Sequence, residues 1–290
     1  MAAVPAPVRY RAILAYDGTN YRGFQRLARD EPSIQGTLEA AIARVSGQRV
    51  TVLGAGRTDA GVHATGQVIA FDLLWRHDDD DLLRAINATL PDDIALQRLE
   101  RAEPGFHPRF DASSRTYQYF VYEAQIRQPM MARMAWWVHP PLHQRLDIDK
   151  MNWAAAKLLG VHDFASFGAP TQGESTIRHV FRSEWEIEVP TQGTRLISYR
   201  IEANAFLYHM VRSIVGTLVE VGLNRMTMAE FIDAFQAKDR GRIRRLAPPH
   251  GLTLIEVNYE RERRGETPAR ESHGSQEDEI QDLHTHNRHD

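Results

Sequence analysis

The most informative segment of this sequence is Gly54-Ala55-Gly56-Arg57-Thr58-Asp59-Ala60-Gly61-Val62-His63-Ala64. Its glycines and alanines let the backbone turn sharply and leave space for another group to approach closely. Among them stand one guanidinium, one carboxylate and one imidazole, from Arg57, Asp59 and His63. A loop that gathers such side chains is a candidate for chemistry rather than for packing alone.

Several familiar sites are excluded by the same residues. Asp59 stands where the dinucleotide fingerprint needs its third glycine, and its charge would repel a pyrophosphate. Gly61 is followed by Val62 and His63, whereas a P-loop needs lysine and then serine or threonine. A metal held by Asp59 and His63 would lack further ligands at nearby spacing, and the chain has no cysteine to supply them. The residues of this segment therefore predict neither a phosphate-binding loop of these two kinds nor a metal site.

What remains is a carboxylate beside a guanidinium. An arginine close to an aspartate favours the ionised carboxylate, which is a competent nucleophile or base. An Arg57–Asp59 pair that only fixes a turn explains the same pattern, so both interpretations stay open on these residues. A third, a hydrolase with Asp59 and His63 as acid and base, lacks an oxyanion site and a second positioned carboxylate.

The segment resembles the active-site motif of the tRNA pseudouridine synthase A family. Further segments, in the same order, resemble the opening strand and loop, the central segment, the late helix start and the closing motif of that family: residues 16–25, 106–110, 114–117, 204–216 and 247–252. The resemblance extends from about Tyr10 to Tyr259. Residues after Glu260 show no such resemblance.

This resemblance implies an α+β fold in which two α+β domains bring antiparallel sheets together at a central catalytic cleft. It implies an isomerase that converts uridine to pseudouridine at positions 38, 39 and 40 of the tRNA anticodon stem-loop. It also implies a homodimer whose partner is tRNA, and no cofactor. No apolar run approaches the roughly 18 residues of a membrane span, and the expected location is the cytoplasm. The alternative function is a catalytically silent RNA-binding module of the same fold.

The resemblance also assigns roles to individual residues. Asp59 matches the essential aspartate, with attack on the base, attack on the sugar and removal of a sugar proton all left open. Tyr117 matches the active-site tyrosine, whose ring stacks on the uracil and whose hydroxyl assists removal of the C5 proton; the alternative is a strand tyrosine that only packs in a core. Arg212 matches the arginine that pairs with the aspartate. Candidate RNA contacts comprise basic, amide and imidazole side chains around these positions: Arg22, Gln25, Arg26, Arg57, His63, Arg115 and His209. For His63 and His209, hydrogen bonds to buried partners are an equal alternative.

The composition divides the chain. Residues 261–290 contain five basic and eight acidic residues and almost no large apolar ones, which predicts a disordered acidic tail. The whole formal charge of −3 can be assigned to that tail, so it does not argue against an RNA partner. Pro104, Gly105 and Pro108 suggest a boundary between an N-terminal α+β domain, residues 1–107, and a C-terminal α+β domain, residues 108–260.

Hydrophobic periodicity predicts the secondary structure within these domains. Strands are expected at 10–16, 67–73, 94–99, 115–123, 181–189, 196–203 and 252–259, and helices at 36–45, 80–90, 148–159, 209–221 and 228–236. Acidic residues from Asp78 to Asp81 suit the positive end of a helix. Five bases between Lys238 and Arg245 form a candidate path for RNA phosphates.

Overall fold

A ten-stranded sheet forms the centre of the fold. The computed structural model describes residues 6–27, 31–141, 144–170, 173, 175–188, 194–243 and 245–259. The main strand order is β4-β1-β3-β10-β5-β9-β8-β7, with β2 paired to β3 and β6 paired to β5. The predicted tail lies outside the described residues. Among the described residues, no helix is long and apolar enough to cross a membrane.

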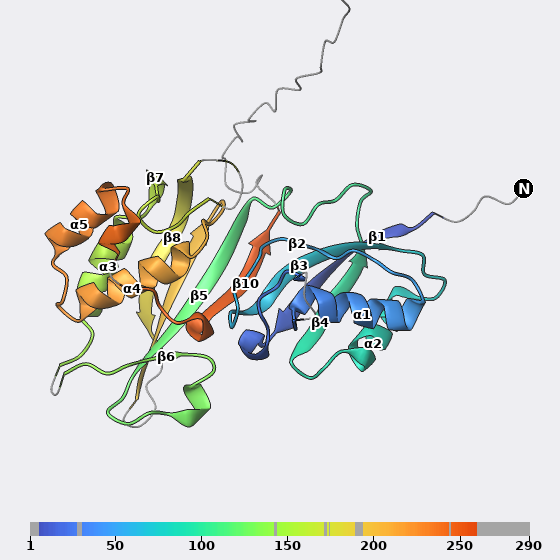
Figure 1. The fold of residues 1–290 in the computed structure, drawn as a ribbon, viewed down its shortest axis with the longest axis horizontal. Coiled ribbons are helices and arrows are strands. Elements are labelled where there is room, and N and C mark those ends of the chain that lie inside the picture. Colours follow the sequence, from blue (N-terminus) through green and yellow to red (C-terminus); the bar gives the residue numbers. More distant parts are fainter. Residues whose placement is uncertain are drawn as a thin grey trace, which may run out of the picture. The chain divides into compact units, whose positions relative to one another are not determined.

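The first half of the sheet comes from residues before the predicted boundary. β1 (Val8–Tyr16) lies between β3 (His63–Leu73) and β4 (Ile94–Arg101) and is antiparallel to both. The short β2 (Leu53–Gly54) adds to β3. Helices α1 (Ile34–Ser46) and α2 (Asp79–Thr89) accompany these strands (Figure 1).

The second half surrounds β5 (Ser114–Glu123). β9 (Arg195–Ala203) is antiparallel to β5, and β8 (Ile177–Ile187) and β7 (Gly160–Asp163) follow it in the sheet. β6 (Trp136–Val138) runs parallel to the end of β5. Three helices accompany this half (Figure 1): α3 (Ile148–Ala156), α4 (Met210–Gly222) and α5 (Met228–Gln236).

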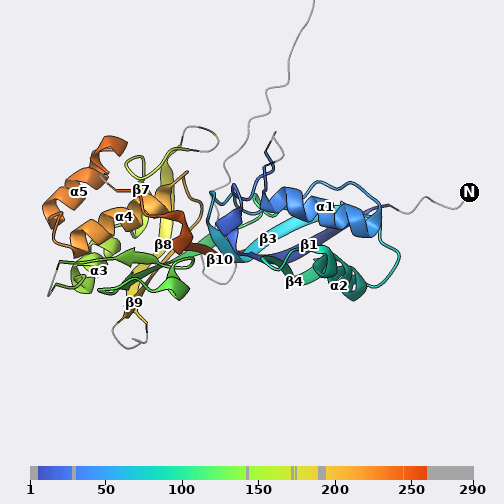
Figure 2. The ribbon, with the colours of Figure 1, turned by 60° about the horizontal axis from the view of Figure 1, so that its bottom comes forward.

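The last strand joins the two halves. β10 (Leu252–Asn258) is antiparallel to β5 and parallel to β3, where Thr253 and Leu254 pair with His63 and Ala64. Figure 2 shows β10 between the two groups of helices. Because β3 begins directly after the glycine-rich segment, this pairing brings that segment against the second half of the fold. One cluster of buried apolar side chains includes residues of both halves.

Helix α4 is the most deeply buried helix of the second half. Almost every residue from Met210 to Gly222 is buried, and its apolar side chains belong to the main core. Gly216 permits a close approach here, because a Cβ at this position would lie only 2.1 Å from the carbonyl oxygen of Arg245. The segment 245–247 therefore lies directly on α4.

The α+β class is confirmed, and each predicted strand and helix has a counterpart whose ends differ by a few residues. Asp78 is the N-cap of α2, and three aspartates form its first turn, as predicted from the acidic run. The helix expected at 148–159 ends at Ala156, before Gly160, whose φ of 96° is unsuited to a helix. The short strands β2, β6 and β7 were not predicted. The boundary after residue 107 falls between β4 and β5 and stays a proposal.

Candidate active site

The glycine-rich segment is held at its start by β3. The backbone N–H of Ala55 donates to the carbonyl oxygen of Val68 at 2.8 Å. The buried amide of Gln67 donates to the carbonyl of Gly56 at 2.9 Å and accepts from its N–H at 3.3 Å. A buried amide that satisfies both groups of one residue fixes the path of the chain there.

The middle of the segment is fixed by the first loop of the chain. The Thr58 and Tyr16 hydroxyls are hydrogen-bonded at 2.8 Å, and the Thr58 carbonyl accepts from the N–H of Phe24 at 3.1 Å. Burial raises the pKa of Tyr16 to about 12, so this hydroxyl stays protonated. The turn closes at Gly61, whose φ of 75° favours glycine. These contacts leave the side chain of Asp59 projecting from a fixed loop.

Asp59 is paired with Arg212 of α4. The Arg212 Nη1 lies 3.1 Å from Oδ2 of Asp59, and the two side chains are 12% and 22% exposed. The same guanidinium donates through Nε to the carbonyl oxygen of Ala247 at 2.8 Å, while the Ala247 N–H donates to the carbonyl of Arg212. The carboxylate is therefore oriented by a charged donor that is itself fixed in place, and it remains accessible to solvent.

His209 is the second partner of Asp59. Its Nε2 lies 3.4 Å from Oδ2 of Asp59, and its ring stacks on Tyr208 with centroids 3.7 Å apart. It precedes α4 with a φ of 65°, an unusual backbone conformation for a residue with a Cβ. Burial lowers the pKa of His209, and Arg212 and Arg240 lower it further, although Asp59 opposes them. The imidazole is thus harder to protonate than an ordinary histidine.

Tyr117 of β5 lies against the same loop. Its ring meets that of Phe206 edge to face at 5.0 Å, and its hydroxyl oxygen is 3.7 Å from where a Cβ of Gly56 would lie. Burial raises the pKa of Tyr117, and interaction with Tyr16 and Asp59 raises it too, while Arg115 lowers it. Its hydroxyl therefore keeps its proton at neutral pH.

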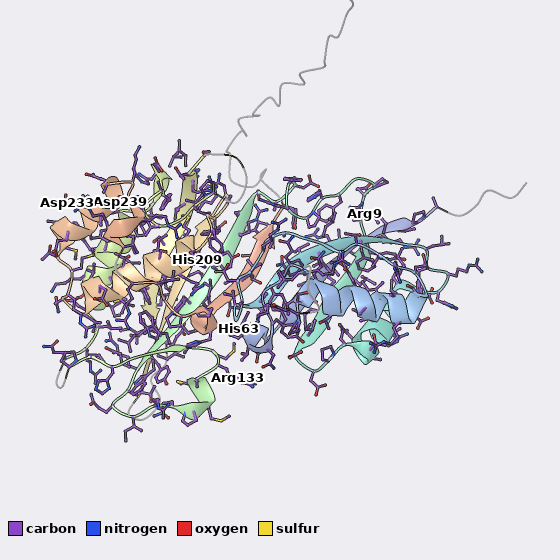
Figure 3. All side chains as sticks on the ribbon, in the orientation of Figure 1. Arg9, His63, Arg133, His209, Asp233 and Asp239 are labelled. Atoms are coloured by element: carbon purple, nitrogen blue, oxygen red, sulfur yellow. The ribbon has the colours of Figure 1, made fainter. Side chains whose placement is uncertain are left out.

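The structure places His63 in the interior. Its Nδ1 accepts from the Gly18 N–H at 3.0 Å, and its Nε2 lies 2.8 Å from the carbonyl oxygen of Arg133 and 3.1 Å from that of His250. Figure 3 labels His63 and Arg133. The Asp17 carboxylate lies 3.1 Å from Nδ1. The ring thus links four segments from both halves and is only 1% exposed.

Arg115 is also buried and bound to backbone. Its Nη1 donates to the carbonyls of Ala112 and Asn204 at 3.2 and 2.9 Å, and its Nη2 to those of Ala55 and Arg109. Burial lowers the pKa of Arg115. The guanidinium joins the glycine-rich segment to the segments before β5 and after β9, so in this conformation it does not face an RNA phosphate.

The other candidate RNA contacts are exposed. Arg22 lies 3.6 Å from Glu31, and Arg26 donates to the buried Glu39 at 2.8 Å. Gln25 and Arg57 line one side of a hollow of about 240 Å³. Arg57 thus faces this hollow, while Arg212 pairs with Asp59.

The basic segment near residue 240 is partly engaged within the protein. Lys238 pairs with Asp163 at 3.0 Å, and Arg245 pairs with Glu220 at 2.8 Å and lies over the ring of Trp136. Arg244 lies outside the described residues. Two of the five bases are therefore already partnered by side chains of the fold.

Sequence reasoning did not single out Gln67 and Thr58, which shape the loop around Asp59. The polar Gln67 inside the apolar strand GQVIAF was an available signal, because a buried amide needs partners. Nothing in the sequence marked the carbonyl of Ala247 as a partner of Arg212. Within the described part of the chain, no group of three or more histidine or acidic side chains is placed to hold a metal ion.

Comparison with known proteins gives this site its context. The family model described as tRNA pseudouridine synthase matches residues 12–111 and 154–260. The tRNA pseudouridine synthase A of Pseudothermotoga lettingae is 39% identical over 252 residues, which cover 87% of this chain and 99% of that protein. The protein of the same name from Neisseria gonorrhoeae strain NCCP11945 is also 39% identical, over 87% of this chain and 92% of its own length.

The chain therefore belongs to the tRNA pseudouridine synthase family, whose members are isomerases acting on tRNA. Among solved structures, the archaeal box H/ACA sRNP Nop10–Cbf5 complex matches 83% of this chain at 12% identity, with a TM-score of 0.30. That score is too low to support an inference about the fold.

Proposed function

We propose that this protein isomerises uridine to pseudouridine at positions 38, 39 and 40 of the tRNA anticodon stem-loop. Membership of the family supports the reaction and the tRNA substrate. The observation that carries the proposal is the accessible carboxylate of Asp59, held by Arg212 at 3.1 Å on a fixed glycine-rich loop. The choice of positions rests on the resemblance of the motifs.

The reaction breaks the N1–C1′ bond and forms a C5–C1′ bond, after which C5 loses its hydrogen and N1 gains one. A uridine must leave its stack before a protein side chain reaches these atoms. Asp59 acts on the flipped nucleotide, as a nucleophile or as a base toward a sugar proton. Arg212 keeps the carboxylate oriented, and the ring of Tyr117 packs against the uracil.

The proton from C5 needs an acceptor near the same nucleotide. The resemblance assigns help in this step to the Tyr117 hydroxyl, which lies against the same loop as Asp59. The His209 imidazole lies 3.4 Å from Asp59, and because its pKa is lowered it is a weaker base than an ordinary histidine. We assign His209 a contact with the bound nucleotide, in keeping with its assignment as an RNA-binding residue.

RNA contacts divide into two kinds. Arg22, Gln25, Arg26 and Arg57 are exposed and reach the RNA directly. His63 and Arg115 serve RNA binding by positioning the loops that carry Asp59, because their polar atoms are already engaged with backbone groups. The protein acts as a homodimer in the cytoplasm, and light scattering after size-exclusion chromatography tests the dimer.

Position-resolved mapping tests the function. Purified protein is incubated with a tRNA that carries uridine at positions 38, 39 and 40, and pseudouridine is located by chemical tagging and primer extension. Three matched transcripts each replace one of these uridines with cytidine. Conversion at the remaining positions is expected; conversion elsewhere only would refute the choice of positions, and binding without conversion would favour the silent RNA-binding module.

A further inference from the structure

The hollow that Gln25 and Arg57 line is formed in part by the glycine-rich segment that carries Asp59. It has a volume of about 240 Å³, and its lining includes Gln25, Gly54, Arg57, His107, Arg109 and Phe110. Liquid water occupies about 30 Å³ per molecule, so this space equals that of about eight waters and has room for a pyrimidine base. Gly54 lets Phe24 pack closely beside it, because a Cβ there would lie 2.5 Å from the Phe24 ring.

One wall of the hollow is an exposed aromatic side chain on a rigid turn. Phe110 is 70% exposed, and its ring lies 4.3 Å from that of His107. The His107 Nδ1 accepts from the N–H groups of Arg109 and Phe110, and the N–H of His107 donates to Asp111 at 2.8 Å. The turn is thus closed by its own side chains. It presents a large apolar ring to solvent with little freedom left to lose on binding.

The hollow is also cationic. Arg57 and Arg109 both line it, and the described residues that line it include no carboxylate. Burial lowers the pKa of Arg109, and the charge of Arg57 lowers it further. The Arg109 Cζ also lies 5.8 Å from the Phe110 ring centroid. An anion between these side chains would be attracted by both charges.

We propose that this hollow binds a second, unpaired nucleotide of the RNA substrate, whose base stacks on Phe110 and whose phosphate lies between Arg57 and Arg109. A flat ring beside cations is the arrangement by which proteins hold single-stranded nucleotides. The Cα atoms of Arg57 and Asp59 lie at most roughly 7 Å apart, so one loop contributes to both sites. The nucleotide is therefore a near neighbour of the target uridine. The inference rests on the proposed function for its substrate.

The contributions of base stacking and of charge to tRNA affinity are separated by measuring tRNA dissociation constants at several salt concentrations. Phe110→Ala is expected to weaken binding by about 5- to 150-fold without changing the salt dependence, because stacking involves no counterions. Phe110→Tyr should bind like the wild type. Arg109→Gln should reduce the salt slope by about one. Val161→Ala, which removes an exposed side chain on the distant β7, is the matched control.

A double-mutant cycle then identifies the nucleotide. Anticodon stem-loops with a single abasic site at each position near the target are bound to wild type and to Phe110→Ala. At one position, the loss of affinity caused by the abasic site and the loss caused by Phe110→Ala should be non-additive, because the base that stacks on Phe110 is already missing. Additive losses at every position, or wild-type affinity of Phe110→Ala, would overturn the inference. Binding needs no turnover, so coupling without pseudouridine formation would refute only the proposed function.

Discussion

Replacing the buried Arg115 tests whether it supports the fold or contacts RNA. In Arg115→Gln the charge is lost, and the new amide has two N–H donors where the guanidinium uses four. At least two of the four carbonyls, on Ala55, Arg109, Ala112 and Asn204, then lose their donor. The change therefore disturbs the buried side of the glycine-rich segment, without removing a group from its solvent-accessible side.

The expected loss of stability follows from the count of unpaired carbonyls. Each buried acceptor left without a partner costs about 1–3 kcal/mol, so two cost about 2–6 kcal/mol. For a domain of this size, 1 kcal/mol shifts the Tm by about 2–4 °C. The variant should therefore melt about 5–20 °C below the wild type. Below its melting temperature, the salt slope of tRNA binding should remain that of the wild type.

Urea unfolding and the salt dependence of tRNA binding measure the two quantities. Arg57→Gln is the matched control, because it makes the same substitution at an exposed position. Its unfolding free energy should change by no more than about 0.5 kcal/mol, while its salt slope should fall by about one. If Arg115→Gln instead kept wild-type stability and lost one unit of salt slope, Arg115 would be a phosphate contact and our reasoning would be wrong.

Three further changes test other parts of the site. Gly216→Ala should destabilise the protein by about 3 kcal/mol and slow turnover, because the new Cβ meets the carbonyl of Arg245; unchanged urea unfolding would contradict this. Arg212→Lys should lower kcat by about 10- to 100-fold with little change in tRNA affinity, since one ammonium cannot replace the guanidinium toward both Asp59 and Ala247. Burial lowers the pKa of both His209 and His250, so the folded chain binds these protons less readily than the unfolded chain. Their stabilising contribution is complete above about pH 6.5 and is lost as pH falls through the lowered values, by at most about 1.4 kcal/mol per pH unit and group. In His209→Gln, the unfolding free energy measured with urea at pH 7.5, 6 and 5 should depend less on pH than in the wild type.

Local periodicity predicted most strands and helices because each buries one face. The strand at 115–123 shows this in its middle, since Tyr117, Tyr119 and Val121 are buried and alternate with the partly exposed Gln118 and Phe120. Periodicity did not predict the shortest strands, because the three residues of β6 and the two of β2 are too few to show a repeating pattern. The parallel pairing of β10 with β3 could not be predicted from the sequence either, since no local pattern links residues 253 and 63.

The glycine-rich segment indicated the location of the site, but not which groups meet there. The pairing of Asp59 with Arg212 came from the family resemblance, because spacing in the sequence favoured Arg57 as the partner. For His63 and Arg115, residue type suggested RNA contact, and only the tertiary structure places their polar atoms against backbone groups. Burial of a charged side chain depends on distant segments, so no local pattern reports it.

The most direct measurement is the release of tritium from tRNA labelled at uracil C5. Every pseudouridine formed must release that hydrogen, so the wild type should release label in step with pseudouridine formation. Asp59→Asn keeps the size of the side chain and removes its charge, and should release label roughly a thousandfold more slowly or not at all. Undiminished release by Asp59→Asn would contradict the role of the carboxylate, and no release by the wild type would contradict the proposed reaction.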